Sequence, residues 1–135
     1  MYKIQVKKIV CHSNNDFIGD IEVYLMCHAD GGTMMRYPPE PAATVDMNDS
    51  SKKTWTMSST EPCVFYFQNS AQVTLYEEDV FFDLGSTDYL GNIYVTRYSF
   101  RHCKDVYGTL QMSDGNGNSF DITLKVTEVE AQADA

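Results

Sequence analysis

The stretch that most constrains the fold of this chain is residues 73–91, which begins as a strand and ends as an acidic loop. Successive side chains of a strand point to opposite faces, so Val73 and Leu75 share one face. The same face continues with Glu77 and Asp79. An unpaired buried carboxylate costs several kcal/mol, so this face must leave the core at the end of the strand.

The loop that follows concentrates negative charge. Five carboxylates fall within twelve residues: Glu77, Glu78, Asp79, Asp83 and Asp88. Like charges repel one another at a cost that grows as they converge. A bound cation is the simplest thing that would reverse this repulsion.

Length and composition favour a single all-β domain. The 135 residues suffice to bury a core without disulfides or metals. Tyrosine and phenylalanine are abundant, and Gly, Asn and Asp separate short alternating runs, which favours strands over helices. We expect one domain over residues 1–129 and a flexible C-terminal tail at 130–135.

Alternation of apolar and polar residues predicts the strands. The last strand alternates cleanly from Phe120 to Val126, and the turn-forming segment 113–118 predicts a hairpin between it and residues 107–112. The first strand, residues 2–11, changes phase before Ile9, which suits a β-bulge. Turn signals recur about every ten residues, which predicts an eight-stranded antiparallel β-sandwich. Residues 38–53 lack a pattern, and we expect a long, mobile surface connection there.

A second acidic loop lies early in the chain. Residues 16–25 read D-F-I-G-D-I-E-V-Y-L. Counted from Asp16, a glycine lies three residues on (Gly19), an acid six residues on (Glu22) and a tyrosine eight residues on (Tyr24). This spacing resembles the first calcium loop of the C2 (calcium- and lipid-binding) domain family, whose pattern is Asp, Gly, Asp and Tyr at those offsets.

The later acidic stretch is similar to the third calcium loop of the same family, in which two acids separated by one residue precede an Asp that lies three residues before a Gly. Here these positions are Glu77, Asp79, Asp88 and Gly91. The two loops have the family's order, and the resemblance covers most of residues 2–128. It implies a C2-like β-sandwich.

The resemblance also implies a calcium site. Its ligands would be Asp16 and Glu22 from the first loop, with Glu77, Asp79 and Asp88 from the third. Ca²⁺ takes six to eight oxygen ligands and accepts carboxylates in mono- or bidentate mode. Two glutamates stand where the family has aspartates, and the third loop is about three residues longer, so the reach of the carboxylates differs.

Apolar residues follow the acids of the third loop at Val80, Phe81 and Phe82. In lipid-binding C2 domains, residues at such loop tips enter the membrane while the metal bridges carboxylates and lipid phosphate. The resemblance therefore implies a non-enzymatic calcium-binding module that engages a phospholipid membrane surface or a protein partner. The other interpretation is that at least one phenylalanine folds back over the core.

Several functions are disfavoured. The formal net charge of −9 lacks the basic footprint of a nucleic-acid-binding protein. His12 and His28 each follow a cysteine, but neighbours on a strand point to opposite faces, which is poor geometry for a base and its nucleophile. No phosphate-binding glycine loop or nucleophile elbow is present. We therefore expect no enzymatic activity.

Neither a signal peptide nor a transmembrane segment is evident in the sequence, so we expect a cytoplasmic or peripheral membrane protein. Cysteines occur at Cys11, Cys27, Cys63 and Cys103, without a CxxC pair. We expect buried free thiols, and one or two disulfides are the alternative.

Two alternatives to the calcium module stay open. One is a metal-free structural or protein-interaction β-sandwich, such as a component of a multi-subunit assembly or toxin, which would use edge strands or a Tyr/Phe-rich surface. The other is a carbohydrate-binding sandwich that would use exposed tyrosines and Trp55.

Overall fold

The computed structural model describes the chain except for residues 15–19, 33, 80–85, 101–104, 116 and 130–135, so the expected tail lies outside the described residues. The described part has ten strands rather than the eight predicted, and one short 3-10 helix. The strands are β1 (Tyr2–Ser13), β2 (Ile21–Ala29), β3 (Met34–Tyr37), β4 (Val45–Met47), β5 (Thr54–Thr56), β6 (Cys63–Phe67), β7 (Ser70–Asp79), β8 (Ser86–Thr96), β9 (Asp105–Ser113) and β10 (Ser119–Glu128), and the helix is η1 (Arg97–Phe100).

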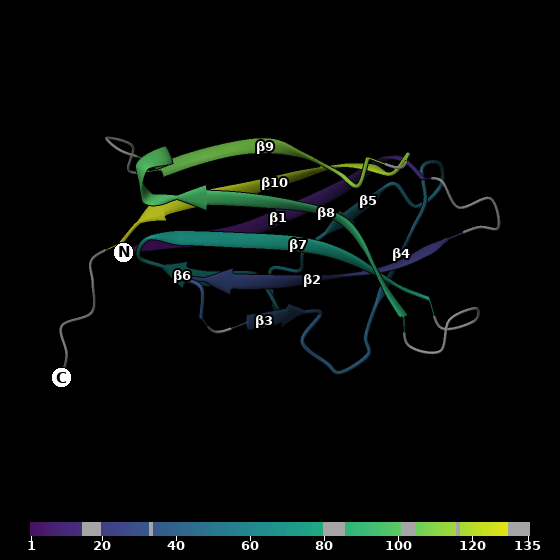
Figure 1. Ribbon diagram of the computed structural model, residues 1–135, viewed down its shortest axis with the longest axis horizontal. Coiled ribbons are helices and arrows are strands. Elements are labelled where there is room, and N and C mark those ends of the chain that lie inside the picture. The colour runs from purple at the N-terminus through teal and green to yellow at the C-terminus, as the bar shows by residue number, and fades with distance from the viewer. Residues whose placement is uncertain (15–19, 33, 80–85, 101–104, 116, 130–135) are drawn as a thin grey trace.

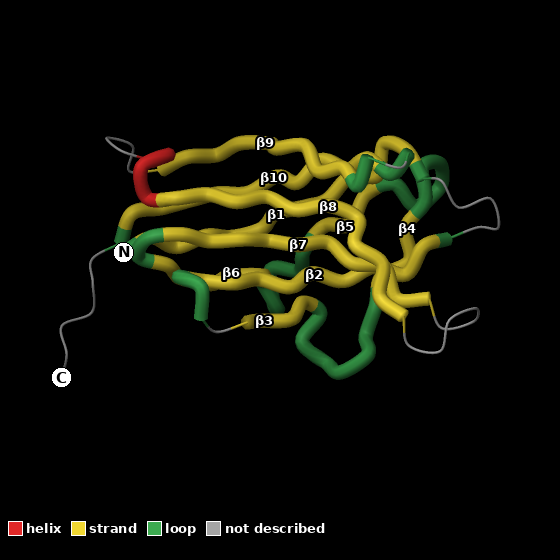
Figure 2. The backbone as a smooth tube through the Cα atoms, viewed as in Figure 1, coloured by secondary structure: helices red, strands yellow, loops and turns green. Residues whose placement is uncertain are grey.

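The strands form two five-stranded antiparallel sheets (Figure 1). The first has the order β5-β1-β10-β9, with β6 paired to β1 beside β5; the second has the order β3-β2-β7-β8, with β4 paired to β2. Figure 2 shows strands joined by turns and loops, with η1 after β8. The predicted all-β antiparallel sandwich is therefore confirmed. No helix in the described part is both long enough and apolar enough to cross a bilayer.

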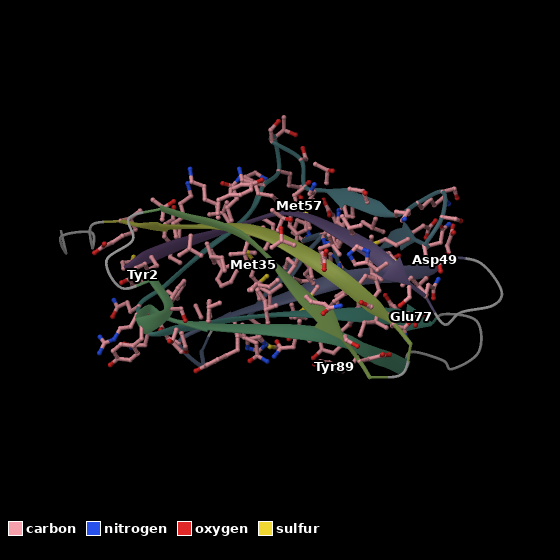
Figure 3. The ribbon with its side chains drawn as sticks, turned by 90° about the horizontal axis from the view of Figure 1, so that it is seen from above. Tyr2, Met35, Asp49, Met57, Glu77 and Tyr89 are labelled. Atoms are coloured by element: carbon pink, nitrogen blue, oxygen red, sulfur yellow. The ribbon has the colours of Figure 1, made fainter. Side chains whose placement is uncertain are left out.

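The core lies between the sheets, where the alternating apolar side chains meet (Figure 3). On β10 the inward residues are at most 3% exposed: Phe120, Ile122, Leu124 and Val126. On β2 they are at most 1% exposed: Ile21, Val23, Leu25 and Cys27. Full burial of a large apolar side chain contributes about 1.5–3 kcal/mol, so these rows hold the two sheets together.

Two local predictions are also confirmed. The pairing of β1 with β10 shifts register between Val6 and Lys8, where the apolar phase changes. The β9–β10 hairpin closes with Ser113 opposite Ser119. Its turn contains Gly115 and Gly117 at φ 78° and 95°, a conformation that glycine adopts without steric cost.

The prediction for residues 38–53 is wrong where β4 lies. Strand β4 pairs with the start of β2, and its Met47 is 0% exposed. Three residues are too few to show alternation, so this pairing could not be read from the local sequence. Trp55 is 8% exposed and stacks on Tyr37 with ring centroids 5.8 Å apart, so it is not available as an exposed sugar platform.

The cysteines are as expected where they are described. Cys11, Cys27 and Cys63 are buried and free, whereas Cys103 lies outside the described residues. Burial raises the pKa of Cys11 to about 11. A hydrogen bond with Cys63, together with burial, raises the pKa of Cys27. The thiols of Cys11 and Cys27 therefore stay protonated at neutral pH, and the three buried cysteines serve as small apolar residues of the core.

Strands β8 and β9, which belong to different sheets, approach each other closely at Gly91. The β7–β8 register pairs Leu75 with Gly91 and then Tyr76 with Tyr89, so that Leu90 is an extra residue in β8. A Cβ atom on Gly91 would lie 2.7 Å from Cβ of Met112 and 3.1 Å from the backbone nitrogen of Ser113. Glycine therefore permits the contact between β8 and β9.

We expect Gly91→Ala to lower the free energy of unfolding by about 1–3 kcal/mol, because the added methyl group overpacks this contact. Urea denaturation measures the change. Gly108→Ala on β9 is the matched control, since its added Cβ would meet nothing within 4 Å. Equal stability of the two variants would contradict the close approach.

At the end of the sandwich where β2 finishes and β7 begins, Asp30 joins the β2–β3 turn to the β6–β7 turn. Its carboxylate accepts backbone N–H donors from Gln68, Asn69 and Ser70 at 2.9, 2.6 and 3.1 Å. Burial opposes ionisation of Asp30, but these donors outweigh it, so the pKa of Asp30 lies below its ordinary value of 3.8. The charged form therefore stabilises the folded state.

We expect Asp30→Asn to lower the melting temperature at pH 7, because an amide NH₂ group cannot accept the N–H donors that a carboxylate accepts. Because the pKa of Asp30 is lower in the folded state than its ordinary value of 3.8, its carboxylate stabilises the fold above pH 3.8. That stabilisation disappears as the pH falls through the pKa of the folded state. Thermal melts should therefore converge for wild type and variant at acidic pH. Glu128→Gln, at an exposed position on β10, is the control, and a wild-type advantage that persists at pH 2 would contradict this role.

Candidate functional site

The described strand ends that flank the two acidic loops, the start of β2 and the end of β7, lie at one end of the sandwich, on the right of Figure 1. Strands β2 and β7 are antiparallel, so the start of β2 lies beside the end of β7, with Val23 opposite Glu77. Strand β4 and the turn after it reach the same end, because Glu22 is opposite Asp46. We call the described residues of this region, 14, 20–22, 46–52, 77–79 and 86–88, the acidic end.

The β7–β8 register brings two predicted ligands together. Glu77 is directly opposite Asp88, and Asp79 is opposite Ser86. Directly opposed residues of antiparallel strands have Cα atoms about 4.5–5.5 Å apart. Like charges in such positions destabilise the strand pair, and a cation between them would relieve that cost.

Glu77 is half-buried and lies on the core-facing side of its sheet, in the same alternation as Val73 and Leu75 (Figure 3). Glu22 lies on the outer face, because it alternates with the buried Ile21 and Val23. The sheet therefore separates these two predicted ligands.

The remaining predicted residues are described in part or not at all. Asp16, Val80, Phe81 and Phe82 lie outside the described residues. For Asp79 and Asp88 the structure describes the backbone but not the side chain. Among the side chains that are described, no three from His, Cys, Asp and Glu are grouped to hold a metal ion. The five-residue calcium site therefore stays a prediction.

Lys52 is the charged residue of this end that sequence reasoning missed. Its Nζ lies 2.6 Å from Oδ2 of Asp20 and 3.9 Å from Oδ2 of Asp46. The Asn48 side-chain amide donates to Oδ1 of Asp20 at 2.7 Å. Hydrogen bonds from Lys52 and then from Asn48 lower the pKa of Asp20. Lys52 is therefore an internal counter-ion for the outer carboxylates.

The turn that carries Lys52 is built by Asn48. Oδ1 of Asn48 accepts the backbone N–H groups of Ser50 and Lys52, each at 2.9 Å. Asparagine followed by polar turn formers is a local signal for such a turn. Nothing in the local sequence indicates that Asp20, thirty-two residues earlier, is the partner of Lys52.

A histidine and a carboxylate meet elsewhere in the first sheet. Nε2 of His12 lies 2.6 Å from Oδ2 of Asp121, and His12 is exposed. The neighbouring Cys11 is 0% exposed and faces the core. The expectation that Cys11 and His12 lie on opposite faces is therefore confirmed.

The described fold is similar to that of solved C2 domains. A C2 domain of plant Extended Synaptotagmin 1 matches with a TM-score of 0.60 at 10% sequence identity, over 96% of this chain and 95% of that one. A structure of CC2D1B matches with a TM-score of 0.61 at 14% identity, over 93% of this chain and 53% of that one, so this chain spans about half of it.

Human GIVD cytosolic phospholipase A2, in complex with an inhibitor and terbium chloride, matches with a TM-score of 0.59 at 14% identity; 93% of this chain corresponds to 16% of that chain. No protein-family model matches the sequence, and no curated protein sequence matches it. The chain therefore has a C2-like fold, and at these identities the likeness concerns the fold alone.

We expect Lys52→Gln to raise the pKa of Asp20 toward 3.8, because the variant removes the hydrogen bond and charge that lower it. Carboxyl-carbon NMR titration of Asp20 measures the shift. Lys53→Gln changes the net charge equally but leaves the Asp20–Lys52 pair intact, so it is the matched control. The pairing is contradicted if both variants move the Asp20 titration by the same amount.

Proposed function

We propose that this C2-like sandwich is a non-enzymatic module that binds Ca²⁺ at its acidic end. The observation that carries the proposal is the β7–β8 register, which sets Glu77 opposite Asp88. Acidic residues at directly opposed backbone positions, of which Glu77 is half-buried, suit a hard divalent cation with oxygen ligands.

The residues that would hold the ion are Glu77, Asp79 and Asp88 from the β7–β8 hairpin, with Asp16 from the β1–β2 connection. Glu22 is the weakest member of the predicted set, because it lies on the outer face of the sheet. When bound, the ion would cancel the repulsion within the hairpin. Because such a site is absent from the unfolded chain, binding would stabilise the folded state.

The proposed use of the site is engagement of a membrane surface or a protein partner. A chain with a net charge of −9 is repelled by anionic lipid, so a cation is needed to bridge carboxylates and phosphate. Val80, Phe81 and Phe82 follow Asp79 directly and would supply the apolar contact. We propose a cytoplasmic or membrane-peripheral setting on the same grounds.

We expect about 1 mM Ca²⁺ to raise the melting temperature by several degrees relative to EDTA, whereas Mg²⁺ should not, since a ligand that binds only the folded state stabilises it. Glu77→Gln should abolish the rise and Glu22→Gln should largely retain it, although both variants remove one charge. Calorimetric titration of the same proteins with Ca²⁺ measures the affinity.

The calcium-loaded protein should then co-sediment with phosphatidylserine vesicles, and Phe81→Ala with Phe82→Ala should weaken that binding without altering the melt. An unchanged melting temperature and no heat of binding in millimolar Ca²⁺ would refute the metal site. Calcium binding without vesicle binding would leave a protein partner as the use of the site.

The second candidate is a metal-free interaction module, and the Lys52 contacts favour it. Lys52 already balances Asp20 and Asp46 without a metal, so part of the acidic end is neutralised within the chain. This candidate predicts that Asp16→Asn and Asp79→Asn change stability little, with or without calcium. The melts described above separate the two candidates.

A further inference from the structure

We propose that β9 is a self-association edge, through which two copies of the chain pair antiparallel about a two-fold axis centred on Thr109. The first sheet of each copy would then continue into the other. This proposal does not depend on calcium binding, because β9 belongs to the opposite sheet from the β7–β8 hairpin.

Strand β9 is the least protected edge of the fold. Within the described residues it pairs with β10 alone, over nine residues, and no charged side chain occurs from Val106 to Ser113. Natural sheets protect their edges with short strands, bulges or charges. The other edge strands are shorter or interrupted: β3, β4, β5 and β6 are four, three, three and five residues long, and β8 carries the extra Leu90 and the charged Asp88.

On the core-facing side of β9, an exposed leucine side chain lies next to a glycine with open space above it. Leu110 is opposite the fully buried Ile122, yet 41% of Leu110 is exposed. Gly108 is opposite the buried Leu124, and an added Cβ there would meet nothing within 4 Å. An exposed leucine therefore lies two residues from open space on the same face.

A two-fold pairing centred on Thr109 fits these features together. It sets Leu110 of each copy opposite Gly108 of the other, and an interface of this kind is self-complementary. Directly opposed residues share a face, so the register can move only in steps that keep the leucine inward. The two neighbouring registers put Gly108 against Gly108, or Leu110 against Leu110, and lose the fit.

The rows across the proposed interface are complementary. On the core side, Leu124 and Gly108 of one copy would continue into Leu110 and Ile122 of the second copy, which extends the apolar core. On the outer side, the row from Asp121 through Gln111 would continue into Tyr107 and Lys125 of the second copy, with opposite charges at its ends. Tyr107 is 65% exposed in the single chain and would gain a partner strand.

The lack of charged residues from 106 to 113 favours a second copy over a basic partner at this edge. Two chains of −9 repel each other, but the contact itself carries no charge between residues 106 and 113. Salt screens the long-range repulsion, so self-association should strengthen as ionic strength rises. A basic partner would be released under the same conditions.

Sedimentation velocity on the full chain tests the proposal. Wild type should form a dimer whose fraction grows with protein concentration and between about 0.05 and 0.5 M NaCl, because the Debye length shortens over this range. Leu110→Lys should be monomeric, because it places an ammonium group in the apolar row. Tyr66→Lys, on β6 at an exposed position of the same sheet, is the matched control and should dimerise like wild type.

A cross-link tests the register independently of any loss of fold. In a Cys103→Ser background, Thr109→Cys should form an intermolecular disulfide with oxidised glutathione, which is reduced to two thiols. Opposed Cα atoms about 4.5–5.5 Å apart allow that bond. Gln111→Cys lies away from the axis and should not cross-link. A monomeric wild type at millimolar concentration, or equal cross-linking at both positions, would overturn the proposal.

Discussion

The pairing of β7 with β2 on one side and β8 on the other governs where the charges of this protein lie. Burial of Val23, Leu25 and their neighbours requires one register, because a slip of one residue would turn the whole apolar row to solvent. The register of β7 with β8, in which Leu90 is an extra residue, carries Glu77 and Asp88 to directly opposed positions at the end of the sheet. Packing of the core therefore holds two acidic residues opposite each other. A cation that relieves their repulsion would find these ligands already in position.

The acidic end consists of two parts with different electrostatics. On the outer side, Lys52 balances Asp20 and Asp46, and Asn48 holds the turn that presents it. On the hairpin side, the register sets carboxylates against each other, which is the arrangement that favours a cation. The proposed calcium module and the metal-free module thus differ in which part governs function. The β9 edge belongs to the other sheet, so self-association and ligand binding can occur on one molecule.

Much of the fold follows from local pattern, because alternation reports burial directly. It predicted the inward row from Phe120 to Val126 and the bulge before Ile9, both of which the structure confirms. Features that depend on distant partners were missed, such as the pairing of β4 with β2 in one sheet and the pair of Lys52 with Asp20. The motif offsets placed Glu22 and Glu77 in one ligand set, but offsets along a strand do not reveal which face meets which across a sheet.

An amide NMR spectrum recorded during calcium titration of the full chain tests the proposed calcium site most directly. If Ca²⁺ binds at the acidic end, the perturbed amides should fall within residues 14–22, 46–52 and 77–88, while those of the Asp30 turn and β9 should stay unchanged. Amides that do not move in millimolar Ca²⁺, or shifts centred on the Asp30 turn, would contradict it.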